Sequence, residues 1–127
     1  MNRTVTPSTI APPAARYAHA IRTEAAEAWL HTAGVVPVRP DGSVPDDLGE
    51  QAEVVWTNLT AILAEAGMAT TDIVSITTYV VAGQELAPVM AARDAALAGH
   101  LVASTLVTVP ALARPEWQME VSLVAAR

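Results

Sequence analysis

The chain contains no cysteine, no lysine and no phenylalanine. Without cysteine it forms no disulfide, offers no thiol nucleophile and builds no cysteine-ligated metal site. Its seven basic residues, all arginine, stand against thirteen acidic residues, and the formal net charge at pH 7 is −6. This balance lacks the positive charge of a nucleic-acid-binding protein, so we expect no nucleic-acid partner.

Long hydrophobic runs are also missing. No stretch approaches the roughly 18 apolar residues of a membrane span, and no hydrophobic block follows Arg3 to form a signal peptide. We therefore expect a cytoplasmic protein with no membrane partner. Aromatic residues make up only 4% of the chain while hydrophobic residues make up 52%, so aliphatic and alanine side chains must fill the core. A small chain this apolar favours oligomerisation, which hides surplus hydrophobic surface.

The length of the chain predicts one domain over residues 1–127. Prolines in residues 1–15 predict an extended or mobile arm. The patterns that follow predict strands at 17–23 and 27–34, a helix at 45–67, a strand at 71–81, a helix at 84–99, and a terminal hairpin. This order predicts a two-layer α+β fold, with a mixed β-sheet and two helices on one face.

The two predicted helices each carry an apolar stripe. In the first, Asp46 and Asp47 favour a helix start, Gly67 favours its end, and the stripe lies between them. The stripe of the first helix comprises Val55, Leu59, Ile62 and Leu63. The stripe of the second comprises Leu86, Val89, Met90 and Leu97, and we expect Arg93 of this helix to face solvent or an ion pair.

The last two predicted strands alternate between two faces, as pleating requires. On the first, one face holds Ala103, Thr105, Val107 and Val109, and the other holds Ser104, Leu106 and Thr108. On the second, one face holds Met119, Val121 and Leu123, and the other holds Gln118, Glu120 and Ser122. Glu120 therefore lies on a polar face, where its carboxylate must be solvated, placed in a wet cleft or paired. It can line one wall together with Ser104 if the register pairs the two strands.

Several segments, in their order and spacing, resemble a known family. The end of the chain reads Val102-Ala103-Ser104-Thr105-Leu106-Val107-Thr108-Val109, followed by a loop and the strand with Glu120. Upstream stand Tyr17-Ala18-His19-Ala20, Gln51 before Asn58-Leu59, Ala66-Gly67 and Asp72-Ile73-Val74. Together they resemble the Rid family of reactive intermediate deaminases, also called YjgF-like or endoribonuclease L-PSP proteins. The family strand reads roughly Pro-Ala-Arg-Ser/Thr-x-Val-x-Val, so its arginine falls on Ser104.

The resemblance implies a chorismate-mutase-like fold and a homotrimer with small-molecule clefts between subunits. In members with deaminase activity, the motif arginine binds the substrate carboxylate and the glutamate positions a water that attacks an imine carbon. Ser104 cannot grip a carboxylate bidentately as arginine does. We therefore expect a substrate other than the standard 2-imino acids, and no cofactor.

Glu120 and Tyr17 are the candidate catalytic residues. A cleft Glu120 could act as general base toward water; alternatively it is a carboxylate hydrogen-bonded across a subunit interface. The Tyr17 hydroxyl could donate to a substrate oxygen, or Tyr17 is an interface aromatic. Both roles come from the resemblance, which places the two residues in the family's cleft.

The candidate substrate-binding residues are Ser104, Thr105, His31 and Arg114. Ser104 lines a cleft or is a plain strand residue, because nothing marks a His/Asp pair that would activate it as a nucleophile. His31 is a proton shuttle or a structural residue. Arg114 is the arginine most suited to reach the cleft, or it satisfies loop carbonyls. The three histidines share no metal-ligand spacing, so we expect no metal site.

Two functions from different classes follow. The first is a Rid-like enzyme that hydrolyses or tautomerises an enamine- or imine-type intermediate of one particular pathway. The second is a non-catalytic trimer that binds a metabolite or holds partner proteins. A polar, water-accessible cleft around Glu120 favours the enzyme, and an apolar pocket with Glu120 paired favours the binding protein.

Overall fold

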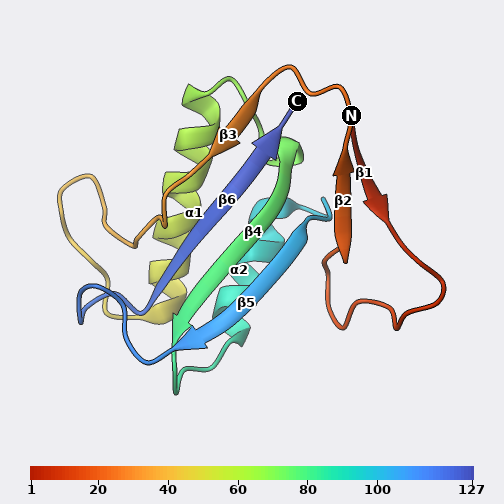
Figure 1. The fold of residues 1–127 in the computed structure, drawn as a ribbon. Helices are drawn as coiled ribbons and strands as arrows, with labels where there is room; N and C mark the ends of the chain where they lie inside the picture. Colours follow the sequence, from red (N-terminus) through yellow and green to blue (C-terminus); the bar gives the residue numbers. More distant parts are fainter.

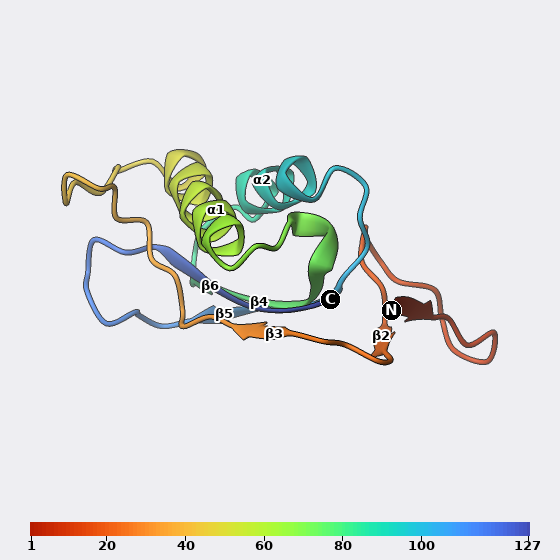
Figure 2. The ribbon, with the colours of Figure 1, turned by 90° about the horizontal axis from the view of Figure 1, so that it is seen from above.

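The computed structural model describes all 127 residues. A four-stranded mixed sheet carries two helices on one face and leaves the other face uncovered (Figures 1 and 2). The strand order is β3 (Trp29–His31), β6 (Met119–Ala126), β4 (Ile73–Val81) and β5 (Ala103–Val109). β4 runs antiparallel to β6 and parallel to β5. The predicted two-layer α+β fold is confirmed.

Helix α1 (Leu48–Glu65) begins where the sequence predicts a cap. The Asp47 side chain accepts a hydrogen bond of 3.0 Å from the Glu50 backbone N–H, which satisfies one of the free donors of the first turn. The helix ends before Gly67, whose φ of +69° is the left-handed conformation that glycine adopts without strain. The α1 residues buried in the core include Ala52, Val55, Trp56, Leu59 and Leu63.

Helix α2 (Ala87–Leu97) is shorter than the predicted 84–99. Its buried residues are Val89, Arg93 and Leu97, spaced four apart on one face. Arg93 therefore occupies the middle of the buried stripe, a place that the sequence suggested for apolar residues. Of the two expected alternatives for Arg93, solvent or an ion pair, the structure shows the ion pair, because its side chain is only 6% exposed and lies 3.0 Å from Asp94.

The two terminal strands do not form the predicted hairpin. β4 lies between them, pairing with β5 on one side and with β6 on the other. β5 follows β4 through α2, and a strand–helix–strand connection brings two strands parallel in one sheet. β5 is consequently an edge strand, whose outer side is paired only at its start, where Ala18 bridges Ala103.

The N-terminal residues build a separate two-stranded sheet. β1 (Asn2–Val5) pairs antiparallel with β2 (Ala20–Thr23), so part of the predicted arm is a paired strand. Asn2 also donates a 2.8 Å hydrogen bond to the Ala126 carbonyl, which ties β1 to the end of β6. A short 3-10 turn, η1 (Thr70–Asp72), leads into β4. Neither helix is long and apolar enough to cross a membrane.

Candidate functional site

The sheet has one face packed on the helices and one face open (Figure 2). Residues directly opposite each other in the ladder share a face. Ile76 and Val80 of β4 are buried in the core under the helices. The alternate residues of β4 and their partners therefore lie on the open face. These are Ser75, Thr77 and Tyr79 of β4, Ala103, Thr105 and Val107 of β5, and Glu120, Ser122 and Val124 of β6.

Glu120 is the acidic residue on this open face. It pairs with Tyr79 across the ladder and is partly buried. None of the three ion pairs of the chain involves Glu120, and its carboxylate accepts no hydrogen bond from other residues. A partly buried carboxylate without a protein partner is available to bind water or a ligand.

A glycine lies against this carboxylate. A Cβ atom at Gly34 would stand 3.0 Å from both Cδ and Oε2 of Glu120 and 3.2 Å from Oε1. The backbone here is held to β6 by a pair of hydrogen bonds between Val35 and Val121, with N···O distances of 2.8 and 3.1 Å. Thr32 adds two more contacts, because its N–H donates to the Leu123 carbonyl and its hydroxyl accepts from the Leu123 N–H. The segment 32–35 is thus fixed beside Glu120.

Ser104 and Glu120 do not share a wall within one chain. Ser104 pairs with the buried Ile76, so it faces the helix layer, whereas Glu120 pairs with Tyr79 on the open face. They also lie two strands and three residues apart, about 14 Å by ordinary strand spacing and rise. The condition for a shared wall within one chain, that β5 and β6 pair with each other, is not met, because β4 lies between them.

The remaining predicted residues are dispersed. Tyr17 lines a cavity of about 240 Å³ with β1 residues, beside the start of β5, where Ala18 forms a bridge with Ala103. Arg114 is in the exposed loop between β5 and β6, and its guanidinium carbon lies 5.6 Å from the Trp117 ring centroid. Neither residue reaches Glu120 in the single chain.

Thr105 and His31 share the open face with Glu120. Thr105 pairs with Thr77, one row of residues away from the Tyr79–Glu120 row. His31 pairs with Val124 near the far end of β6, and its ring lies 6.5 Å from that of Trp29, tilted by 23°. Within one chain, the site around Glu120 therefore includes hydroxyl groups but no basic side chain.

Sequence reasoning missed Tyr79, Thr77 and Gly34. The alternation along β4 contained a signal for the first two, because placing Ile76 and Val80 in the core leaves Thr77 and Tyr79 on the other face. The position of Gly34 against Glu120 depends on a contact between distant segments, which no local pattern reveals. No three histidine, aspartate or glutamate side chains cluster as metal ligands do.

Comparison with known proteins places this geometry in a family. The family described as Endoribonuclease L-PSP matches residues 8–127. No curated protein matches the chain. Among solved structures, YyfB of Yersinia pestis, a conserved Rid protein, is 31% identical with a TM-score of 0.89, over 99% of this chain and 98% of that one.

Two Escherichia coli structures are also similar. The YjgF gene product is 27% identical with a TM-score of 0.73, over 98% of both chains. TdcF with bound serine is 24% identical with a TM-score of 0.73, over 95% of this chain and 92% of that one. The family match over residues 8–127 and the identity to a Rid protein along nearly all of both chains show that this chain belongs to the Rid family, the endoribonuclease L-PSP proteins.

Proposed function

We propose that the protein is a Rid-type enzyme that hydrolyses or tautomerises an enamine- or imine-type small molecule, with Glu120 as the general base. The observation that carries this proposal is the Glu120 carboxylate, which has no protein partner and lies against Gly34 on the open sheet face. A carboxylate in this situation can hold a water and accept its proton as the water attacks an imine carbon.

The proposed active site is a cleft between subunits of a homotrimer. Tyr17, Ser104 and Glu120 cannot meet within one chain, since Ser104 and Glu120 occupy opposite faces of the sheet. Two subunits that meet at the edge of β5 could bring Tyr17 and Ser104 of one chain to Glu120 of the next. The open face carries exposed hydrophobic side chains, among them Trp29 and Val107, which a second subunit would cover.

We expect little or no hydrolysis of 2-iminopropanoate or similar 2-imino acids. Residue 104 supplies only a neutral hydroxyl where family members with this activity have a carboxylate-binding arginine. A pathway-specific substrate, bound in part by Tyr17, Thr105, His31 or Arg114, is proposed instead. The serine bound to TdcF is a property of that protein, but it encourages tests with small amino-acid derivatives.

The experiment is a measurement of ammonia release from a panel of imines and enamines generated in situ, with and without the protein. The proposal expects at least one panel member to be hydrolysed faster than the spontaneous rate. The alternative is a trimeric binding or holdase-like protein, which the exposed Trp29 and Val107 would also suit. Saturable ligand binding or suppressed aggregation of a client protein, with no accelerated hydrolysis anywhere in the panel, would favour that alternative.

A further inference from the structure

A groove of about 800 Å³ runs between α1 and α2, which lie side by side over the sheet in Figure 2. Small side chains of α2 leave this space open, namely Pro88, Ala91, Ala92 and Ala95. At one end the helices approach each other, because a Cβ atom at Gly49 of α1 would stand 3.6 Å from Cβ of Pro88. The volume is in the range of small-molecule sites.

One polar group of the α1 wall is nearly buried and has no partner. Trp56 is 5% exposed and lines the groove. The chain has two fully enclosed side-chain nitrogens without a partner, in Arg93 and Trp117, and the Trp56 nitrogen is not one of them. The indole N–H of Trp56, which makes no hydrogen bond within the chain, is therefore open to the groove. Because a buried indole N–H normally has a partner, a ligand atom that accepts this hydrogen bond would complete the wall.

The other polar side chains of this wall are acceptors. The hydroxyls of Thr57 and Thr60 donate hydrogen bonds of 2.9 and 2.8 Å to the backbone carbonyls of Glu53 and Trp56. Since a hydroxyl has a single proton, only its lone pairs remain for a ligand. The Glu53 carboxylate is exposed, takes part in none of the three ion pairs of the chain, and can only accept. A ligand with several N–H donors and a positive charge matches these groups.

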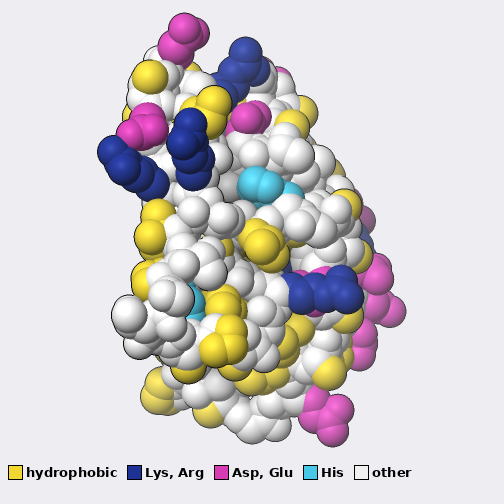
Figure 3. Space-filling view, turned by 90° about the vertical axis from the view of Figure 1, so that its right-hand side faces the viewer, with side chains coloured by type: hydrophobic (Ala, Val, Ile, Leu, Met, Phe, Trp, Pro, Cys, Tyr) yellow, Lys and Arg dark blue, Asp and Glu magenta, His cyan; other side chains and the backbone are white.

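The charge of the two helices is also negative toward solvent. α1 contains Glu50, Glu53 and Glu65 and no basic residue. The basic residue of α2, Arg93, is buried and pairs with Asp94. Figure 3 views the molecule from the side of β1 and β2, and it shows acidic side chains along the margin where the helices lie and arginine mainly near the top of the opposite margin. The groove therefore attracts a cation and repels an anion.

We infer that the groove between α1 and α2 binds a small organic cation, a protonated primary amine with an apolar body. The ammonium group, which is charged at neutral pH as that of lysine is, donates to the Glu53 carboxylate and to the hydroxyl oxygens of Thr57 or Thr60. The apolar body lies on the alanines of α2, and an aromatic ring in it accepts the Trp56 N–H. Glu120 lies on the other face of the sheet, so this site is separate from the proposed active site.

The test is an NMR titration with phenethylamine, and its neutral control is 2-phenylethanol, in which a hydroxyl replaces the ammonium group. The chain has three tryptophans and therefore three indole N–H signals, and Trp56→Phe identifies that of Trp56. We expect phenethylamine to shift the Trp56 signal saturably with a Kd of about 1 mM or tighter, and 2-phenylethanol to bind about fivefold more weakly. The signal of Trp29, on the open sheet face, should not move.

Two pairs of variants at exposed positions test the assigned contacts. Glu53→Gln removes the charge in the groove and should weaken phenethylamine binding about fivefold. Glu65→Gln removes the same charge at the last residue of α1, outside the groove, and should leave binding unchanged. Ala95→Leu fills the groove and should abolish the shift, whereas Ala61→Leu, at an exposed position of α1 outside the groove, should preserve it.

The inference is overturned if phenethylamine leaves the Trp56 signal in place, if 2-phenylethanol binds equally well, or if Glu53→Gln binds phenethylamine unchanged. A response of Trp29 alone would place the amine on the open sheet face and would contradict the groove as well. A changed oligomeric mass in Ala95→Leu would also overturn the inference, because the groove would then be an interface between copies of the chain.

Discussion

Gly34 determines the space available to the Glu120 carboxylate. Because a Cβ atom there would stand 3.0 Å from Cδ and Oε2, Gly34→Ala should push the carboxylate away from its position. The φ of Gly34 is not positive, so the backbone tolerates alanine and the variant should fold. We expect turnover of an identified substrate to fall about tenfold, as misplacement of a reacting group does.

A double variant provides the control for Gly34→Ala. If the loss acts through Glu120, adding Gly34→Ala to Glu120→Gln should reduce turnover no further than Glu120→Gln alone. A further additive loss would show that Gly34 matters for another reason, such as the fixed path of residues 32–35, and the assigned contact would be unimportant for catalysis.

At the scale of elements, Gln51 of α1 joins two loops. Its side chain is fully buried; Nε2 donates to the carbonyls of Pro45 and Glu116 at 2.8 and 2.9 Å, and Oε1 accepts from the Gln118 N–H at 2.9 Å. This links the start of α1 to the segment that leads directly into β6 and Glu120. Two of the three hydrogen bonds of this amide fix the loop before β6, and the third fixes the loop before α1.

Gln51→Ala should therefore lower the free energy of unfolding by about 2–4 kcal/mol, since it leaves buried backbone groups without partners. Urea denaturation measures the change. Gln84→Ala, at an exposed position before α2, is the matched control and should change stability by less than about 0.5 kcal/mol. Equal effects of the two variants would contradict the linking role of Gln51.

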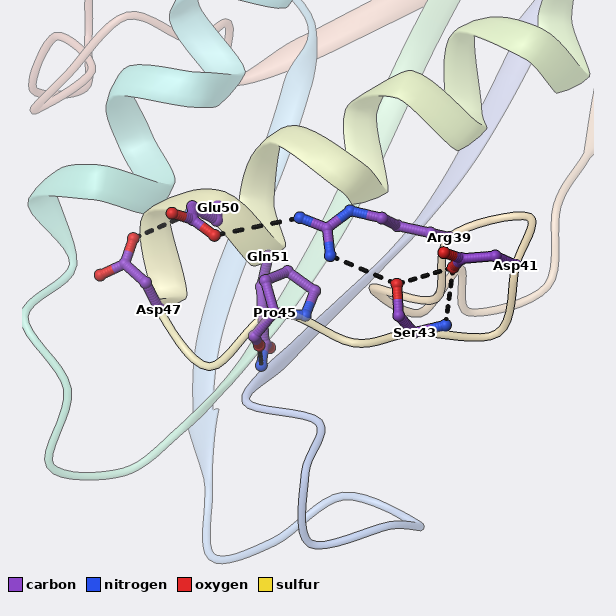
Figure 4. A network of polar contacts seen from close by, with 7 residues as sticks. All are labelled: Arg39, Asp41, Ser43, Pro45, Asp47, Glu50 and Gln51. Atoms are coloured by element: carbon purple, nitrogen blue, oxygen red, sulfur yellow. Dashed lines mark hydrogen bonds and ion pairs between the residues drawn. The ribbon is translucent and has the colours of Figure 1, made fainter.

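The loop before α1 contains a second polar cluster, drawn in Figure 4. The Ser43 hydroxyl and backbone N–H donate to Oδ1 of Asp41 at 2.7 and 2.9 Å. These two bonds, with a smaller contribution from the Arg39 charge, hold the pKa of Asp41 below its usual value of 3.8. Arg39 also lies 3.9 Å from Glu50 of α1.

Because folding favours ionised Asp41, its stabilising effect is complete above the unfolded-state pKa and is lost as the pH falls through the lower folded-state pKa. Ser43→Ala should raise the pKa of Asp41 toward 3.8, as measured by NMR titration of its carboxyl carbon. An unchanged pKa in that variant would show that Ser43 does not stabilise the carboxylate.

The sequence predicts elements better than it predicts their pairing. The cap at Asp47, the positions of Val55, Leu59 and Leu63 in the stripe of α1, and the alternation along β5 and β6 are local patterns with which the structure agrees. Ile62, which the sequence also placed in that stripe, is exposed instead. The predicted hairpin between β5 and β6 does not form, because strand pairing depends on segments that are distant in the sequence. The strand–helix–strand order of β4, α2 and β5 could have predicted the parallel pair.

The residues of the candidate site were also easier to predict one by one than in their relation to one another. Glu120 was correctly assigned to the polar side of β6, but its relation to Ser104 required the register of two other strand pairs. Arg93 fitted the periodicity of the α2 stripe, yet its charge argued against burial, and only the packed structure reveals that it lies inside. Contacts such as Gly34 with Glu120 arise only from the assembled fold.

At the scale of the whole molecule, the uncovered sheet face predicts self-association. Val107 lies on this face and is 39% exposed, while Ile62 lies on α1 in the other layer and is 36% exposed. If the open face forms the trimer interface, Val107→Glu should dissociate it and Ile62→Glu should not. Mass photometry or sedimentation distinguishes a trimer from the 13.3 kDa monomer. Loss of the trimer in both variants, or in neither, would contradict this interface.

The most direct test of the proposed function is the turnover of Glu120→Gln with an identified imine or enamine substrate, measured together with its oligomeric mass. The substitution keeps the shape of the side chain and removes the base. We predict a trimer that folds as the unmodified protein does and that loses at least about 100-fold in kcat, within the usual contribution of general base catalysis. A trimeric Glu120→Gln that keeps full turnover would show that Glu120 is not the base and that the proposed site is wrong.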